Sequence, residues 1–163
     1  MRVLRKMLFW LLVLIVVAVA GVAVYMRAAP LGAAAEHVDP MTVTRAATPN
    51  NVLTGPEGLS GSGKPAPLWM ASPEDLMAAL DKVALAADRT RRVAGSVDAL
   101  HATYVQRSRL MGYPDFISVK ALPAGEGATL AVYSRSRYGR SDLGVNAKRV
   151  AAWLDAIDLP RVE

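Results

Sequence analysis

Cysteine is missing from this 163-residue chain, and histidine occurs only twice. Without cysteine there can be no disulfide bond and no lipid-modified cysteine, so the sequence neither requires nor excludes an oxidising compartment. The two histidines, His37 and His101, have no second ligand at a paired spacing, which argues against a metal site. We therefore expect no metal and no cofactor.

Motifs for catalysis are also scarce. No G-x-S-x-G turn occurs, and His101 would complete a hydrolase triad only if one of the many serines reached it. A lone histidine in a strand is more often packed or hydrogen-bonded than catalytic. The stretch Gly58–Lys64 has the spacing of a phosphate-binding loop, but Pro65 stands where that motif needs serine or threonine. We expect no catalytic residue and interpret this stretch as a linker.

Charge is absent from the twenty residues Met7–Met26, a run that as a helix would span the roughly 30 Å hydrocarbon core of a bilayer. Three basic residues precede the run and only Arg27 follows closely, a bias that keeps the N-terminus cytoplasmic. A cleaved signal peptide is the alternative, because Ala33–Ala35 offers a site of small residues, although such apolar regions usually have about 7–15 residues. We expect a retained anchor in the inner membrane of a bacterium, with the C-terminal domain in the periplasm.

Three regions follow from composition. Residues 1–27 form the cytoplasmic N-terminus and the transmembrane anchor. Residues 28–67 contain scattered proline, glycine, serine and threonine without a sustained period, which is typical of a tether with short ordered pieces. Residues 68–163 form the predicted soluble domain.

The soluble region has the pattern of an α+β domain. A helix begins at Ser72, which can cap it, with Pro73 in its first turn, and apolar residues follow at helical spacing. Just before this cap, Trp69 is expected to pack on the domain edge. Strand-like runs then occur at about Arg92–Val97, Leu100–Arg109, Phe116–Leu122 and Thr129–Tyr138, with turn residues between them. The prediction is a two-layer α-β-β-β-β-α arrangement with a four-stranded antiparallel sheet.

The stretch Tyr133–Arg149 joins the last strand to the last helix. Its alternation places Tyr133, Arg135 and Arg137 on one face of the strand, and Gly139 then allows a turn. Asp142 is expected to cap the helix and to pair with Arg135 or Arg149.

This stretch also resembles a known family. It is similar to the domain of unknown function 1499 (DUF1499) family, whose signature is the run R-S-x-S-R-x-G-x-S-D-L-G-x-N-x-x-R. The matching residues here are Arg135, Ser136, Arg137, Gly139, Ser141, Asp142, Leu143, Gly144, Asn146 and Arg149. Members of that family commonly have a P-N-C-V-S segment near the start of the domain, where this chain has Asn51 in place of the cysteine. The resemblance implies a fold and an envelope setting, but no activity.

Candidate ligand-binding residues come from the register of the sheet. If Ile117, Val119 and Ala121 face the helices, the opposite face is open and carries basic side chains suited to phosphate or carboxylate. The alternative is an ordinary solvated face. A second candidate is the corner before the last helix, as an anion-binding turn. The candidates are Arg107, Arg109, Arg135, Arg137, Asn146 and Arg149.

Two classes of function remain. The first is a non-enzymatic membrane-anchored envelope domain that contacts membrane lipid and binds a membrane-protein partner or an anionic envelope ligand. The second is an uncharacterised enzyme acting on a lipid or cell-wall substrate. The lack of a recognisable acid, base and nucleophile favours the first, and the compartment argues against nucleic acid as a partner.

Overall fold

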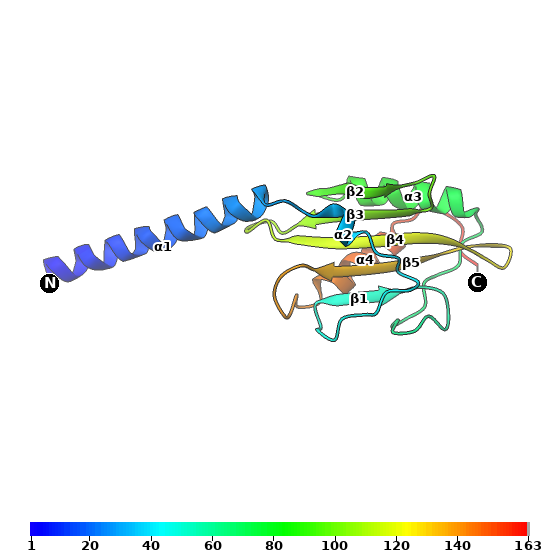
Figure 1. Ribbon diagram of the computed structural model, residues 1–163, viewed down its shortest axis with the longest axis horizontal. Coiled ribbons are helices and arrows are strands. Elements are labelled where there is room, and N and C mark those ends of the chain that lie inside the picture. The colour runs from blue at the N-terminus through cyan, green and yellow to red at the C-terminus, as the bar shows by residue number, and fades with distance from the viewer. Residues whose placement is uncertain (163) are drawn as a thin grey trace.

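The computed structural model describes residues 1–162 as one long helix followed by a two-layer α+β domain (Figure 1). Helix α1 (Arg2–Ala28) has 27 residues and buries none of them. An 18-residue window within it has a mean hydropathy of 3.0, so the helix is long and apolar enough to cross a membrane. It ends at Ala29, which leaves the helical conformation because it precedes Pro30, whose ring disfavours a helical residue before it.

The domain contains a five-stranded antiparallel sheet in the order β1-β5-β4-β3-β2, formed by β1 (Asn51–Thr54), β2 (Thr90–Ser96), β3 (His101–Arg107), β4 (Pro114–Ala124) and β5 (Gly127–Ser136). The predicted meander of four consecutive strands is confirmed as β2 to β5. The predicted number of strands was one too few. The strand that was missed, β1, has only four residues and lies within residues 28–67, which were predicted to form a tether. Its pairing with β5, with Val52 opposite Ser134, makes it a strand.

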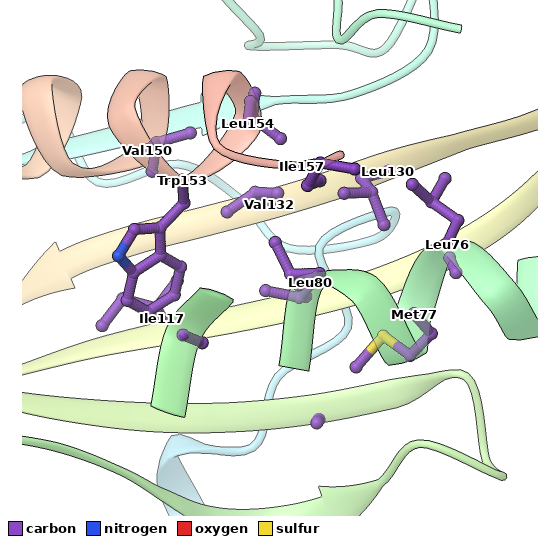
Figure 2. Packing of buried hydrophobic residues seen from close by; sticks show 14 of the residues in the cluster. Leu76, Met77, Leu80, Ile117, Leu130, Val132, Val150, Trp153, Leu154 and Ile157 are labelled. Carbon is purple, nitrogen blue, oxygen red and sulfur yellow. The ribbon is translucent and has the colours of Figure 1, made fainter. Parts of the chain in front are cut away.

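Helices α3 (Pro73–Ala86) and α4 (Val145–Asp155) cover one face of this sheet. Helix α3 begins as predicted, since the Ser72 hydroxyl accepts a hydrogen bond of 3.0 Å from the Asp75 amide. Between helices and sheet lies the hydrophobic core (Figure 2), to which α3, β4, β5, α4 and the residues after α4 contribute Leu76, Met77, Leu80, Ile117, Leu130, Val132, Val150, Trp153, Leu154 and Ile157. The burial of each such side chain is worth about 1.5–3 kcal/mol.

Trp69 does not pack at the domain edge as predicted. Its side chain is fully buried in the same core. The Trp69 backbone pairs with Ala128 of β5, and this pairing places the side chain among the core residues.

The opposite face of the sheet is also covered, which the sequence did not indicate. Residues 30–39, which include the short helix α2 (Ala33–Glu36), run across it, and we call them the covering segment. Arg137 Nη1 donates to the Leu31 carbonyl at 2.7 Å, Arg135 Nη2 to the Glu36 carbonyl at 2.8 Å, and Lys120 forms an ion pair with Asp39. Part of the stretch predicted as a tether therefore packs against the domain.

Candidate functional site

The structure separates the six candidate residues into three places. Asn146 and Arg149 belong to α4 and are buried between this helix and the sheet. Arg107, Arg135 and Arg137 belong to the other side. Arg109 is exposed in the connection between β3 and β4.

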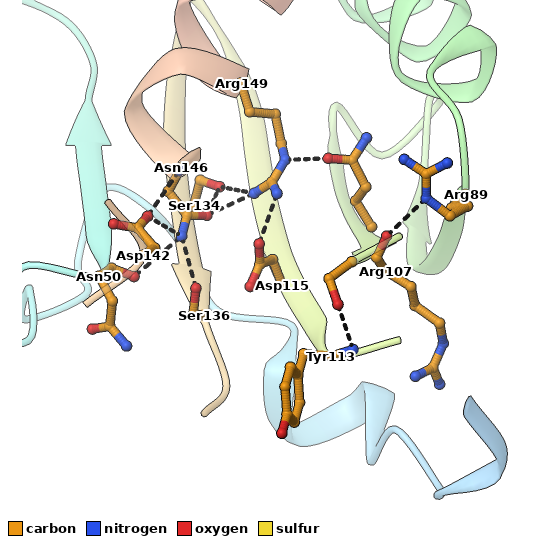
Figure 3. A network of polar contacts seen from close by, with 12 residues as sticks. Asn50, Arg89, Arg107, Tyr113, Asp115, Ser134, Ser136, Asp142, Asn146 and Arg149 are labelled. Atoms are coloured by element: carbon orange, nitrogen blue, oxygen red, sulfur yellow. Dashed lines mark hydrogen bonds and ion pairs between the residues drawn. The ribbon is translucent and has the colours of Figure 1, made fainter. Parts of the chain in front are cut away.

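Arg149 is the centre of a polar cluster between α4 and the sheet (Figure 3). Its Nη2 donates to Asp115 Oδ2 of β4 at 2.7 Å, and its Nε donates to Gln106 Oε1 of β3 at 2.5 Å. Its Nη1 donates to Asn146 Oδ1 at 2.7 Å and to Ser134 Oγ of β5 at 3.2 Å. The ion pair is nearly dry, since the Arg149 and Asp115 side chains are only 6% and 14% exposed. Every nitrogen of the guanidinium group is thus bonded to the chain itself.

Asn146 extends this cluster towards β1. Its Oδ1 accepts from the Ser134 hydroxyl at 2.6 Å, while its Nδ2 donates to Asp142 Oδ2 at 2.7 Å, to Ser136 Oγ at 3.0 Å and to the Asn50 carbonyl at 3.2 Å. The signature residues of the corner therefore tie the last strand, the last helix and the residue before β1 together. This arrangement is structural, because the amide has no free donor left for a ligand.

Asp142 caps α4 as predicted, but it does not pair with an arginine. Its two oxygens accept from the amides of Gly144 and Asn146 at 3.0 Å and 2.8 Å. Burial opposes ionisation of this carboxyl, but these hydrogen bonds outweigh it and hold its pKa below the ordinary value. The predicted pairing was wrong because Arg149 is bonded to Asp115 and Arg135 to Glu36.

The other face of the sheet carries the arginines in the predicted register. Arg135 and Phe116 are direct neighbours across β5 and β4, and Ile117 and Val119 face the helices as expected. Arg135 forms an ion pair of 2.8 Å with Glu36 and lies 5.1 Å from the centre of the Tyr133 ring. The guanidinium groups of Arg135 and Arg137, predicted to be open to a ligand, are therefore bonded to the covering segment.

The two histidines meet where the covering segment, which contains His37, packs on β3, which contains His101. The rings of His37 and His101 stack with their centres 4.0 Å apart, and His37 Nδ1 shares a hydrogen bond of 2.8 Å with the Thr103 hydroxyl. His101 Nε2 lies 3.1 Å from the Val38 carbonyl. Burial and the neighbouring His101 lower the pKa of His37, and Asp39 partly offsets this effect. Within residues 1–162, no three histidine, aspartate or glutamate side chains gather to hold a metal ion.

A basic cavity lies where α1 meets the domain. It has a volume of about 320 Å³ and is lined by Arg27, Arg89, Thr90, Arg91, Val105, Arg107, Ser108 and Gly112. A second hollow of about 480 Å³ adjoins it and shares Arg27, Arg91 and Arg107. We call these three residues the arginine cluster.

Of these three residues, only Arg107 was among the ligand-binding candidates predicted from the sequence. Arg91 was missed because the predicted strand began one residue later. The register could have found it, since Arg91 pairs with Val105, two residues before Arg107 and on the same face of the sheet. Arg27 was interpreted only as a charge flanking the membrane segment.

Together these features define a class of protein: an α+β domain preceded by a helix that could cross a membrane, with a polar corner that joins strand and helix. The chain belongs to the family described as "Protein of unknown function (DUF1499)", whose model matches residues 41–157. The resemblance seen in the signature run is thus confirmed. No curated protein and no solved structure matches the chain.

Proposed function

We propose that this chain is a non-enzymatic, single-pass membrane protein that presents its DUF1499 domain directly on the membrane surface. There it would bind either a membrane-protein partner or an anionic envelope ligand. The observation that carries this proposal is the contact between anchor and domain. Arg107 Nη1 donates to the Met26 carbonyl at 2.6 Å, and Arg27 Nη2 donates to the Leu110 carbonyl at 2.7 Å. These bonds hold the domain against the end of α1.

Exposed apolar and aromatic side chains at the same end of the domain support this placement. Leu110 is 81% exposed and Leu143 is 88% exposed. Tyr113 and Tyr138 lie beside each other, with ring centres 6.0 Å apart, and both remain partly exposed. Tyrosine favours the boundary between lipid and water, where its ring and hydroxyl meet different surroundings. We infer that this end of the domain touches the bilayer.

The proposed orientation rests on the charges around α1. Arg2, Arg5 and Lys6 precede the apolar run and favour a cytoplasmic N-terminus. The domain would then lie in the periplasm of a bacterial cell. The Arg149 cluster argues against a catalytic role for these signature residues, because the guanidinium nitrogens of Arg149 are bonded to groups of the chain itself.

The absence of cysteine makes a direct test of topology possible, because an introduced cysteine is the only thiol in the chain. We expect Ser141→Cys in intact spheroplasts to react with a membrane-impermeant maleimide. The control, Lys6→Cys, should react only after the membrane is opened. Wild-type protein should stay in the membrane pellet after carbonate extraction.

The opposite labelling pattern would contradict the proposed orientation. A mature product that lacks α1, seen as a lower mass, would instead show that the apolar helix is a cleaved signal peptide.

A further inference from the structure

We propose that the arginine cluster at the end of α1 binds the phosphate group of an anionic phospholipid headgroup. Arg27, Arg91 and Arg107 would surround the phosphate in the cavity of about 320 Å³ between anchor and sheet. This site deepens the proposed function, and it rests on α1 lying in a membrane. It differs from the Arg135 and Arg137 face, whose guanidinium groups hold the covering segment.

The first argument is that the positive charges of the arginine cluster have no acidic partner within residues 1–162. The side chains of Arg27 and Arg107 donate only to neutral backbone carbonyls, and the Arg91 side chain makes no hydrogen bond or ion pair within residues 1–162. Burial, together with the positive charges of Arg91 and Arg27, lowers the pKa of Arg107. Repulsion of this kind is relieved when an anion lies between the cations. The Arg89 side chain, on the cavity wall, is paired with Asp88 instead.

The second argument is the chemistry of the guanidinium group. Its planar fork of N–H donors matches two oxygens of a phosphate, and such charge-assisted bonds are roughly twice as strong as neutral ones. Arg107 uses only Nη1 in its hydrogen bonds, to the carbonyls of Met26 and Gly112, so its Nη2 keeps donors for a ligand. Arg91 keeps all of its donors. The cluster can therefore bind an anion without giving up the bonds that join anchor and domain.

The third argument is the position of the arginine cluster along the membrane normal. Arg27 follows immediately after the apolar run Met7–Met26 and lies at the end of α1 from which the chain enters the domain. If that run spans the hydrocarbon core of about 30 Å, Arg27 and the groups around it lie at the level of lipid phosphates. A headgroup is thus the phosphate-bearing group nearest to the cavity.

Gly112 shows that the cavity wall is closely fitted to the anchor. It has a φ of +74°, and a Cβ atom at this position would come within 2.6 Å of Arg27 Cγ. Any side chain here would displace Arg27 and also strain the backbone. The turn between β3 and β4 is thus shaped to receive Arg27.

The test uses the full chain in non-ionic detergent, with retained lipid measured by native mass spectrometry. Phosphatidylglycerol and phosphatidylcholine are added separately, since both carry a phosphate but only the first has a net negative charge. We expect wild-type protein to retain phosphatidylglycerol preferentially and Arg91→Gln to bind it about tenfold more weakly, as expected for one lost charge-assisted contact. The Arg91 side chain is exposed and has no partner among the residues that the structure describes, so this variant should fold normally.

Two matched controls remove one positive charge elsewhere. Arg140→Gln lies at the membrane end of the domain but outside the cavity, and Lys64→Gln lies in the loop that follows β1. Both residues are exposed, and neither should change lipid retention by more than about twofold. An equal loss in Arg140→Gln would show diffuse attraction to the membrane surface and would overturn the site. Equal retention of both lipids by the wild type would overturn it as well.

Inorganic phosphate, added as a competitor, distinguishes the two sources of the ligand. Binding of free phosphate with no retained lipid would assign the cluster to a soluble phosphate and would contradict the lipid proposal. Carbonate extraction of each variant separates this inference from the proposed function. Protein that leaves the membrane shows that anchoring has failed, whereas protein that stays in the membrane but retains no lipid shows that the headgroup site alone is wrong.

Discussion

The Arg149 side chain joins more of the fold than any other polar group described above. Its three nitrogens reach Gln106 on β3, Asp115 on β4 and Ser134 on β5, while its backbone belongs to α4. A charge in such a dry place is tolerated only because its partners are fixed around it. The final arginine of the signature run thus positions the sheet against the helix.

We expect Arg149→Met to lower the free energy of unfolding by about 3 kcal/mol, because the Asp115 carboxylate would be left buried without its partner. The measurement is thermal or urea unfolding of the full chain in detergent, followed by near-ultraviolet circular dichroism. Lys148→Met is the matched control. The Lys148 side chain lies next to Arg149 on the same helix, is exposed and has no partner within residues 1–162, so this variant should change the free energy of unfolding by less than about 0.5 kcal/mol. A loss in Arg149→Met as small as that in Lys148→Met would show that the Arg149 cluster adds little to stability.

At the scale of elements, the covering segment neutralises and partly buries one face of the sheet. Glu36 and Asp39 neutralise Arg135 and Lys120, and the segment buries Thr103 and Ser118 beneath it. The strands contribute basic side chains to this face of the sheet. Their positive charges are paired with acidic side chains that lie about eighty to a hundred residues earlier in the chain. The sheet is therefore sandwiched between helices on one side and the covering segment on the other.

We predict that acidification loosens the covering segment through His37. The pKa of His37 is lowered in the folded protein by burial and by His101, against the opposing effect of Asp39, which is itself paired with Lys120. The released segment then binds more protons than the packed one once the pH falls below the ordinary histidine value of about 6.5. The stabilisation is complete above that value and declines as the pH falls towards the lowered pKa of the folded state.

Hydrogen exchange of the amides in residues 36–39 tests this prediction at pH 7.5 and pH 5.0, with rates corrected for the intrinsic effect of pH. Protection in wild-type protein should be lower at pH 5.0. His37→Gln should lose most of this dependence, because glutamine does not titrate. A variant with an undiminished response would assign the effect to other groups.

At the scale of the whole molecule, the anchor and the domain form one unit rather than a domain on a long tether. Arg27 and Arg107 connect the end of α1 to the end of β3 and the turn between β3 and β4, and the chain then continues over the sheet, away from α1 (Figure 1). The long axis of the domain continues away from α1. If α1 crosses a membrane as proposed, one end of the domain is near the membrane and the other is far from it.

A fluorescent probe attached to a single cysteine can measure this difference. We expect a probe at Leu110→Cys, at the anchor end, to be quenched by spin-labelled lipids in reconstituted vesicles. A probe at Glu126→Cys, in the exposed turn between β4 and β5 at the opposite end of the sheet, should be unaffected. Equal quenching at both positions would mean that the domain lies flat or moves freely on the membrane.

Many features of this protein could be predicted from local sequence. The apolar run, the cap at Ser72 and the two-residue alternation in β4 and β5 each reflect neighbours along the chain, so they indicate helices, strands and faces without further information. The signature run likewise led to the correct family. What these patterns have in common is that their physical cause lies within a few residues.

The remaining features depend on contacts between distant parts of the chain. Strand β1 exists because β5 pairs with it, and the arginines of the sheet are bonded largely to backbone carbonyls of residues 26–36. A carbonyl is present in every residue, so no sequence pattern marks it as a partner. The arginine cluster likewise joins positions 27, 91 and 107, which only folding brings to one cavity. Short-range spacing therefore specified the elements and their faces, whereas long-range backbone contacts specified which basic groups are occupied and which are free.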